Sequence, residues 1–114
     1  MSPPLQSWME KAAGVAGVLA CGARLADRSF AARSFRPDLP ESRILEALRD
    51  VSEVAYSLQQ NRLAAERLRW TFEAAQIRCL VLPGGVLGAL IVGRETADLP
   101  ECERLLAEFA AAAS

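Results

Sequence analysis

The chain has 114 residues and a formal net charge of −1, with 52% hydrophobic and 24% charged residues. These values predict one globular domain over residues 1–114, and they lack the basic excess of nucleic-acid and anionic-membrane binders. The sequence contains no histidine, which excludes Ser-His-Asp and Cys-His catalytic groups and every histidine-containing zinc site, so we expect no enzyme, no metal and no cofactor.

The N-terminal third predicts a helix followed by two strands. Residues 4–13 place four apolar side chains on one helical face, and Ser2 is positioned to cap this helix. Val15–Arg24 is apolar at both odd-numbered and even-numbered positions, which is typical of a strand buried on both faces of a sheet. Ser29–Phe35 is half polar and predicts a strand nearer the edge of the sheet.

Residues 39–63 form the longest predicted helix. Asp38, just before it, is the expected cap, and Pro40 lies in its first turn. At about 100° per residue, the apolar side chains fall into a core stripe and a second line beside it. The core stripe consists of Ile44, Ala47, Leu48, Val51, Ala55 and Leu58. The second line consists of Leu45, Tyr56 and Leu63. Together they span about twice the stripe that a helix needs on one sheet face, which predicts a second partner surface unless loops of the same chain cover the second line.

The C-terminal half predicts three strands and a helix. In Arg67–Glu73, apolar residues alternate with polar ones, so one face of this strand is buried and the other is solvated. Ile77–Leu82 and Val86–Val92 are apolar at nearly every position, and residues 83–85 (Pro-Gly-Gly) join them as a hairpin. Residues 99–112 form an amphipathic helix.

The element order αββαβββα predicts an α+β sandwich. Strands that are apolar at both parities belong in the centre of a sheet covered by helices on both sides, and strands with a polar face belong at its edges. The simplest antiparallel order is then 2-1-5-4-3, with the long helix on one face and the two terminal helices on the other. Arg67–Glu73 becomes an open edge without a proline or bulge to block pairing. A two-fold dimer that joins this edge to its copy, with the long helices side by side, explains both the open edge and the wide helix stripe.

The order, the length and the inferred sheet resemble the Roadblock/dynein light-chain domain, which has a profilin-like architecture. The segments Leu68-Arg69-Trp70-Thr71-Phe72 and 77–92 are similar to the three-strand meander of that family. One departure lies at residues 26–29 (Ala-Asp-Arg-Ser), where members often carry an Asp-Gly turn. The resemblance implies a non-catalytic dimer that scaffolds or regulates a Ras-like small GTPase or serves as a dynein light chain; stand-alone prokaryotic copies are commonly found near small GTPases.

The same resemblance implies two sets of site residues. The candidate dimer interface consists of Leu45, Tyr56, Leu63, Leu68, Arg69, Trp70, Thr71 and Phe72. The candidate partner face consists of Glu46, Arg49, Asp50 and Glu53. The alternative for the second set is a solvated helix face with ion pairs such as Arg49–Glu53. The implied partners are a second copy or a paralogue and a small GTPase, with no nucleic acid and no membrane insertion.

A different function class stays open at this point. A small-molecule sensor of profilin-like or PAS-like type would need a pocket between sheet and helix, lined by polar groups among apolar ones. One segment is biased in charge and would suit an acidic partner or a phosphate, although a solvated hairpin with Asp27 and Asp38 nearby is the favoured interpretation. This segment carries Arg24, Arg28, Arg33 and Arg36.

The cysteines predict no redox or metal chemistry. Cys21, Cys79 and Cys102 match no zinc or disulfide spacing and have mostly apolar neighbours, so we expect buried thiols in a reducing compartment. The N-terminus lacks the basic and apolar pattern of a signal peptide, so we expect a cytoplasmic protein.

Overall fold

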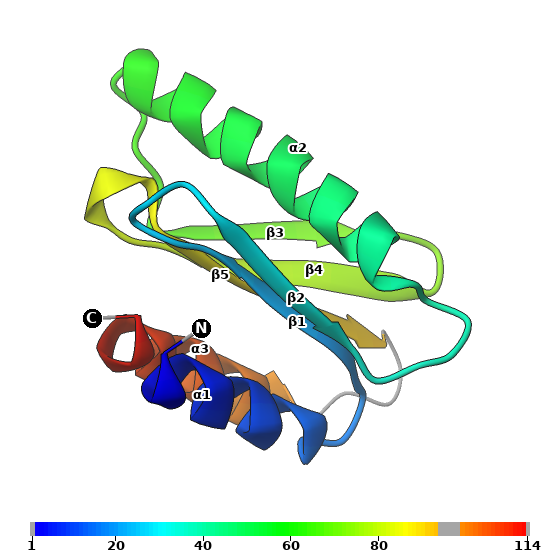
Figure 1. Ribbon diagram of the computed structural model, residues 1–114. Coiled ribbons are helices and arrows are strands. Elements are labelled where there is room, and N and C mark those ends of the chain that lie inside the picture. Colours follow the sequence, from blue (N-terminus) through cyan, green and yellow to red (C-terminus); the bar gives the residue numbers. More distant parts are fainter. Residues whose placement is uncertain (1, 94–98, 114) are drawn as a thin grey trace.

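The computed structural model describes residues 2–93 and 99–113. The elements are, in chain order, α1 (Pro3–Ala13), β1 (Val18–Arg24), β2 (Phe30–Ser34), α2 (Glu41–Gln60), β3 (Arg67–Thr71), β4 (Ala75–Val81), the short 3₁₀ turn η1 (Pro83–Gly85), β5 (Leu87–Gly93) and α3 (Leu99–Ala112). The strands form one antiparallel sheet in the order β2-β1-β5-β4-β3, with α2 on one face and α1 and α3 on the other (Figure 1). The predicted α+β class, element order and strand order are confirmed.

The central strands owe their position to side chains that are apolar on both faces. In β1, Cys21 and Ala23 belong to the core beneath α1 and α3, while Ala20 belongs to the core beneath α2. In β5, Leu90 and Ala89 divide between the same two cores. A strand of this kind is stable only where helices cover both of its faces, which places β1 and β5 in the middle of the sheet.

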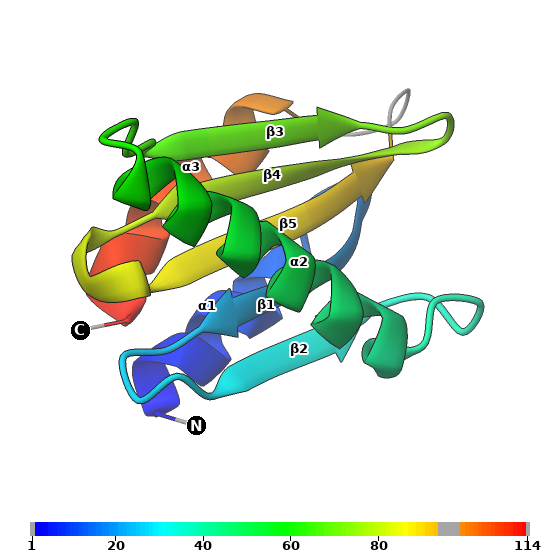
Figure 2. The same ribbon diagram turned by 90° about the horizontal axis from the view of Figure 1, so that it is seen from above.

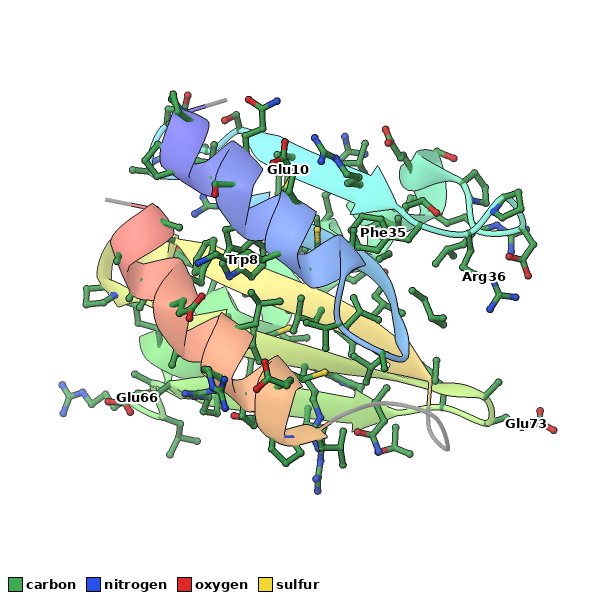
Figure 3. The ribbon with its side chains drawn as sticks, turned by 90° about the horizontal axis from the view of Figure 1, so that it is seen from below. Trp8, Glu10, Phe35, Arg36, Glu66 and Glu73 are labelled. Atoms are coloured by element: carbon green, nitrogen blue, oxygen red, sulfur yellow. The ribbon has the colours of Figure 1, made fainter. Side chains whose placement is uncertain are left out.

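The side covered by two helices is densely packed. Trp8 lies between α1 and α3 (Figure 3), with its ring centroid 5.0 Å from that of Phe109 and its Nε1 donating to the carbonyl oxygen of Leu105 at 2.7 Å. A Cβ atom added at Gly88 of β5 would lie 2.6 Å from the Phe109 ring. Glycine at this position therefore allows α3 to lie close to the sheet.

The long helix is shorter than predicted at both ends. It begins at Glu41, after Pro40, so Asp38 is not its cap and instead pairs with the Arg36 guanidinium at 3.3 Å. At the other end, Arg62 adopts a left-handed φ of 61°, and the Leu63 amide donates to the carbonyl oxygen of Leu58 at 2.8 Å. This is the Schellman pattern that ends a helix. Leu63 therefore lies beyond α2 rather than on its surface.

Several strand boundaries also differ from the prediction, and β3 ends at Thr71 instead of Glu73, because the Phe72 amide donates to Ala75 and closes the turn. Strand β1 begins at Val18 instead of Val15, because Gly17 has a φ of 85° that an extended strand cannot contain. Strand β4 begins at Ala75 instead of Ile77, because Thr71 of β3 is still in register with Gln76. The predicted hairpin over residues 83–85 is present as η1 and closes with the Leu82 amide donating to Val86 at 2.8 Å.

The β1–β2 turn carries an arginine where a glycine is usual. The Arg28 amide donates to the carbonyl oxygen of Leu25 at 3.0 Å, and Arg28 has a φ of 70°. Asp27 accepts from the Ser29 amide at 3.0 Å, and the hydrogen bonds from the Ser29 hydroxyl and amide lower the pKa of this carboxyl. The chain therefore keeps the turn without the Asp-Gly pattern, but Arg28 must adopt the left-handed backbone conformation that glycine adopts more easily.

We expect the substitution Arg28→Gly to raise the free energy of unfolding by about 0.5–1 kcal/mol. It removes left-handed strain of about 1–2 kcal/mol, offset by about 0.4–1 kcal/mol from the greater freedom of glycine in the unfolded chain. Urea denaturation of the two proteins measures the difference. Arg28→Ala is the matched control, since it loses the same charge and keeps the strain, and a gain in this control would contradict the explanation.

Candidate functional site

Among residues 2–93 and 99–113, no strand pairs with the outer edge of β3. The Val81 amide donates to Glu66 and the Phe72 amide donates to Ala75, both at 2.8 Å, which fixes the phase of the β3–β4 ladder. Residues 68 and 70 therefore form the hydrogen-bonded pairs with β4. The amide and carbonyl groups of the alternate residues, 67, 69 and 71, point away from the sheet.

The two faces of β3 differ in chemistry. Leu68 and Trp70 pack against the core beneath α2. On the opposite face, Glu103 of α3 accepts from Arg67 at 2.7 Å and from Arg78 at 2.6 Å, so one carboxylate ties α3 to both β3 and β4. Arg69 lies on this same face, directly opposite Arg78 in the ladder.

A shallow apolar groove of about 150 Å³ runs between α2 and β3, and we call it the α2–β3 groove. It is lined by Ala47, Asp50, Val51, Val54, Trp70, Phe72 and Ile77. Val54 is 41% exposed and Phe72 is 52% exposed. The groove exists because α2 crosses the sheet diagonally and packs mainly on β1 and β2, leaving β3 along the far edge (Figure 2).

The predicted second line of α2 does not border this groove. Tyr56 follows Val54 by two residues, so it lies about 200° round the helix, and Leu45 points to the same flank as Tyr56. Tyr56 is 63% exposed, Leu45 is partly buried against the α2 core, and Leu63 lies after the end of the helix. The structure therefore brings Leu68, Trp70 and Phe72 together with α2, but through a different flank of the helix.

Four groove residues lie outside the interface and partner sets that the sequence predicts: Ala47, Val51, Val54 and Ile77. Ala47 and Val51 belong to the predicted core stripe, and Ile77 belongs to a predicted central strand. The seven-residue spacing between Ala47 and Val54 puts both on one side of a helix, which is a usable signal. What the spacing does not give is the direction in which α2 leans across the sheet, and that direction decides which flank faces β3.

Comparison with known proteins rests on structure, because no family model and no curated protein matches this sequence. A Roadblock/LC7 domain from Streptomyces avermitilis is similar with a TM-score of 0.65 and 12% sequence identity, over 94% of this chain and 89% of that chain. The chain has the Roadblock/LC7 fold. MglC from Myxococcus xanthus is similar with a TM-score of 0.56 and 12% identity, over 96% of this chain and 93% of that chain. The predicted resemblance is thus confirmed at the level of the fold.

Within this Roadblock fold, the candidate partner face is divided. Glu46, Arg49 and Glu53 are exposed on the outward side of α2, whereas Asp50 turns into the α2–β3 groove. The expected Arg49–Glu53 ion pair does not form among the described residues, because Arg49 lies over the Phe30 ring, 5.9 Å from its centroid. The outward carboxylates are therefore not neutralised by this arginine.

The arginine-rich segment does not converge on one site. Arg24 donates to the carbonyl oxygen of Gly85 at 2.7 Å and so braces the η1 turn, while Arg36 pairs with Asp38. Arg28 sits at the tip of the β1–β2 turn and Arg33 lies opposite Cys21 in the ladder. These separate placements support the solvated-hairpin interpretation.

The structure offers little room for a small ligand between sheet and helix. The space enclosed beneath α2 is about 10 Å³ and is lined by apolar side chains and Gly22, far below the several hundred Å³ of ordinary ligand pockets. Across residues 2–93 and 99–113, no group of three potential ligands is arranged to hold a metal ion, and no helix there is long and apolar enough to cross a membrane.

The three cysteines are buried and unpaired with one another. Cys21 and Cys102 belong to the core beneath α1 and α3, and Cys79 belongs to the core beneath α2. Burial raises the pKa of the Cys21 thiol to about 12, although the charge of Arg33 opposes it, and burial alone raises the pKa of Cys79 to about 12. These thiols are protonated and inert in the folded protein.

We expect the free energy of unfolding to fall as pH rises from 9.0 toward about 12. In this window the unfolded chain releases thiol protons that the folded chain keeps, so each cysteine lowers stability by about 1.4 kcal/mol per pH unit. Urea unfolding at about pH 8 and about pH 10 measures the slope. The Cys21→Ala/Cys79→Ala double variant should show a shallower slope, and equal slopes would mean that the thiols are not buried.

Proposed function

We propose that this chain is a non-catalytic interaction module that dimerises through β3 and scaffolds or regulates a Ras-like small GTPase. The observation that carries the proposal is the open β3 edge beside the α2–β3 groove. The fold and the resemblance to Roadblock domains support the GTPase part of the proposal, and the whole of residues 1–114 serves as one such module.

The β3 edge supports dimerisation because it is a ready strand-pairing surface. The amide and carbonyl groups of residues 67, 69 and 71 point outward from an extended, regular strand and pair with no other strand that the structure describes. Strand addition satisfies such groups with main-chain hydrogen bonds and takes its selectivity from the alternate side chains. A second β3 related by a two-fold axis would extend the sheet across both chains.

The α2–β3 groove supplies the apolar area that an edge alone lacks. Stable interfaces bury roughly 800 Å² per partner, more than one short strand provides. Val54, Phe72 and the half-buried Trp70 offer apolar surface directly beside the edge. In the proposed dimer, the two helices α2 lie alongside each other and cover both grooves.

The outward side of α2 is the proposed docking face for the GTPase. It carries Glu46, Arg49 and Glu53, which are exposed and do not line the groove, and Arg49 also lies over the Phe30 ring of β2. In the proposed dimer, two such faces lie side by side and form one broad charged surface. Charged surfaces of this kind set association rate and selectivity more than raw affinity, as expected for a regulatory contact.

We expect the wild-type chain to have twice the mass of 12.3 kDa in light scattering, and Arg69→Pro to have the monomer mass. The amide of residue 69 points outward, so proline removes a hydrogen bond of the dimer while leaving the β3–β4 ladder intact. Circular dichroism checks that Arg69→Pro is folded. Gln6→Arg, on the exposed face of α1, is the matched surface control and should stay dimeric.

This experiment also separates the two candidate dimer surfaces. Tyr56→Glu tests the α2 flank away from β3, and Val54→Glu tests the flank that lines the groove. Dissociation by Val54→Glu with a stable Tyr56→Glu dimer is the expected result. A wild-type monomer at all concentrations tested would refute dimerisation.

We expect the dimer to capture a co-encoded small GTPase in a nucleotide-dependent way. A pull-down with the GTPase loaded with GDP or with a non-hydrolysable GTP analogue measures this. The double reversal Glu46→Arg/Glu53→Arg should reduce capture at least about fivefold while the mass stays dimeric, because it inverts the charge of the docking face. Equal capture by this variant and by Gln6→Arg would place docking elsewhere, and no nucleotide dependence with any co-encoded GTPase would refute the proposal.

A further inference from the structure

We infer that β3 pairs with a second copy of this chain in one register, in which Trp70 lies on the two-fold axis. This inference rests on the proposed dimer and goes further, because it names the register of the two strands and the residues that select it.

The phase of the ladder limits the registers available. Residues with outward backbone groups pair with one another across an antiparallel seam. For β3 these are residues 67, 69 and 71. A two-fold axis must then pass through a residue rather than between two residues, so the candidate centres are residues 68, 69, 70 and 71.

A centre at Arg69 uses the whole strand but opposes like charges. Arg69 would face its own copy, and Arg78 already lies directly opposite Arg69 within each chain. Four guanidinium groups would then stand in a row across four neighbouring strands spaced by about 4.8 Å. Glu103 pairs with Arg78, whereas Arg69 makes no ion pair with a described residue. Like charges directly opposite destabilise strand pairing.

The outer centres are excluded for different reasons. A centre at Leu68 places Arg67 opposite Arg69 of the second copy, and does so twice. A centre at Thr71 leaves Thr71 as the only hydrogen-bonded pair, because Glu73, which would face Arg69, lies in the turn that the Phe72 amide closes on Ala75. Neither register combines a ladder with favourable side-chain pairs.

A centre at Trp70 resolves these conflicts. Trp70 then faces Trp70 of the second copy in a non-hydrogen-bonded pair, where opposite side chains lie closest. Arg69 faces Thr71, and Leu68 faces Phe72, whose ring is 52% exposed in the single chain. All of the apolar pairs fall on the α2 face, where they continue the lining of the α2–β3 groove.

The residues that flank β3 agree with this register. Glu66 and Glu73 lie at opposite ends of the strand (Figure 3). Glu73 lies in the β3–β4 turn, because the Phe72 amide already donates to the carbonyl oxygen of Ala75, so it adds no further pair to the seam. With Arg69 on the axis, Phe72 would come opposite Glu66, whereas with Trp70 on the axis it comes opposite Leu68. The apolar side chains of the edge are therefore complementary to themselves in one register, which selects a second copy over a strand of different sequence.

Disulfide trapping tests the register directly. Equal amounts of Leu68→Cys and Phe72→Cys proteins are mixed and oxidised with copper phenanthroline, and the covalent heterodimer is measured by intact mass. The inference predicts at least about tenfold more of it than from a Leu68→Cys and Trp70→Cys mixture, because thiols whose Cα atoms lie more than about 7 Å apart cannot be bridged. Both mixtures replace residue 68 and one aromatic residue, so they are matched.

Two controls make the result decisive. Wild type should give no covalent dimer, because its three cysteines are buried. Trp70→Cys alone should crosslink to itself as a second readout of the axis. Preferential crosslinking of the Leu68→Cys and Trp70→Cys mixture, or no crosslink from either mixture while the unoxidised proteins are dimeric, overturns the register and leaves the dimer standing. A monomeric wild type in light scattering instead overturns the dimer itself.

Discussion

One helix cannot cover one face of a five-stranded sheet, and the rest of this structure follows from that mismatch. Five strands spaced by about 4.8 Å span roughly 20 Å, whereas a helix with its side chains is about 10 Å wide. On one face two helices meet the requirement, and Trp8 and Phe109 are almost fully buried between them. On the other face α2 stands alone over β1 and β2. Although Cys79 of β4 is buried, the larger apolar side chains of β3 and β4 on that face are consequently only half-buried: Leu68, Trp70, Ile77 and Val81.

The densely packed face gives the open edge its rigidity. Glu103 binds Arg67 and Arg78 at once and so fixes β3 and β4 to α3 from the side opposite the groove. The Arg78 side chain is 12% exposed and the Glu103 side chain is 45% exposed, so the Arg78–Glu103 pair is partly shielded from solvent on the arginine side. An edge strand held in this way is ordered before any partner arrives, which lowers the entropy lost on pairing.

The sequence predicts the architecture well because the alternation of apolar and polar residues in each strand indicates whether one face or both faces of that strand are buried. Val18–Arg24 and Leu87–Gly93 are apolar on both faces, and this alone separates centre from edge. The element ends are predicted less well, since backbone conformation decides them. Arg28 and Arg62 both take left-handed φ values, which an arginine in a sequence does not predict. Helix α2 begins after Pro40 and not after the expected cap Asp38. The open β3 edge follows from the alternation of apolar and polar residues, but the flank of α2 that faces β3 does not. Tyr56 and Val54 are both apolar residues on the sides of this helix, and only the tilt of α2 over the sheet decides which of them lies beside β3.

The two faces of the proposed seam have separate physical tasks. On the α2 face, Leu68, Trp70 and Phe72 supply apolar area, which is nearly indifferent to exact alignment. On the α3 face, Arg67 and Arg69 supply charges, which penalise wrong alignments without adding much stability of their own. Because the groups that bind and the groups that discriminate lie on opposite faces of one strand, affinity and selectivity could vary independently. A docking face on the outward side of α2 would then be complete only when the register is correct, so a partner bound there would sense the dimer and not the single chain.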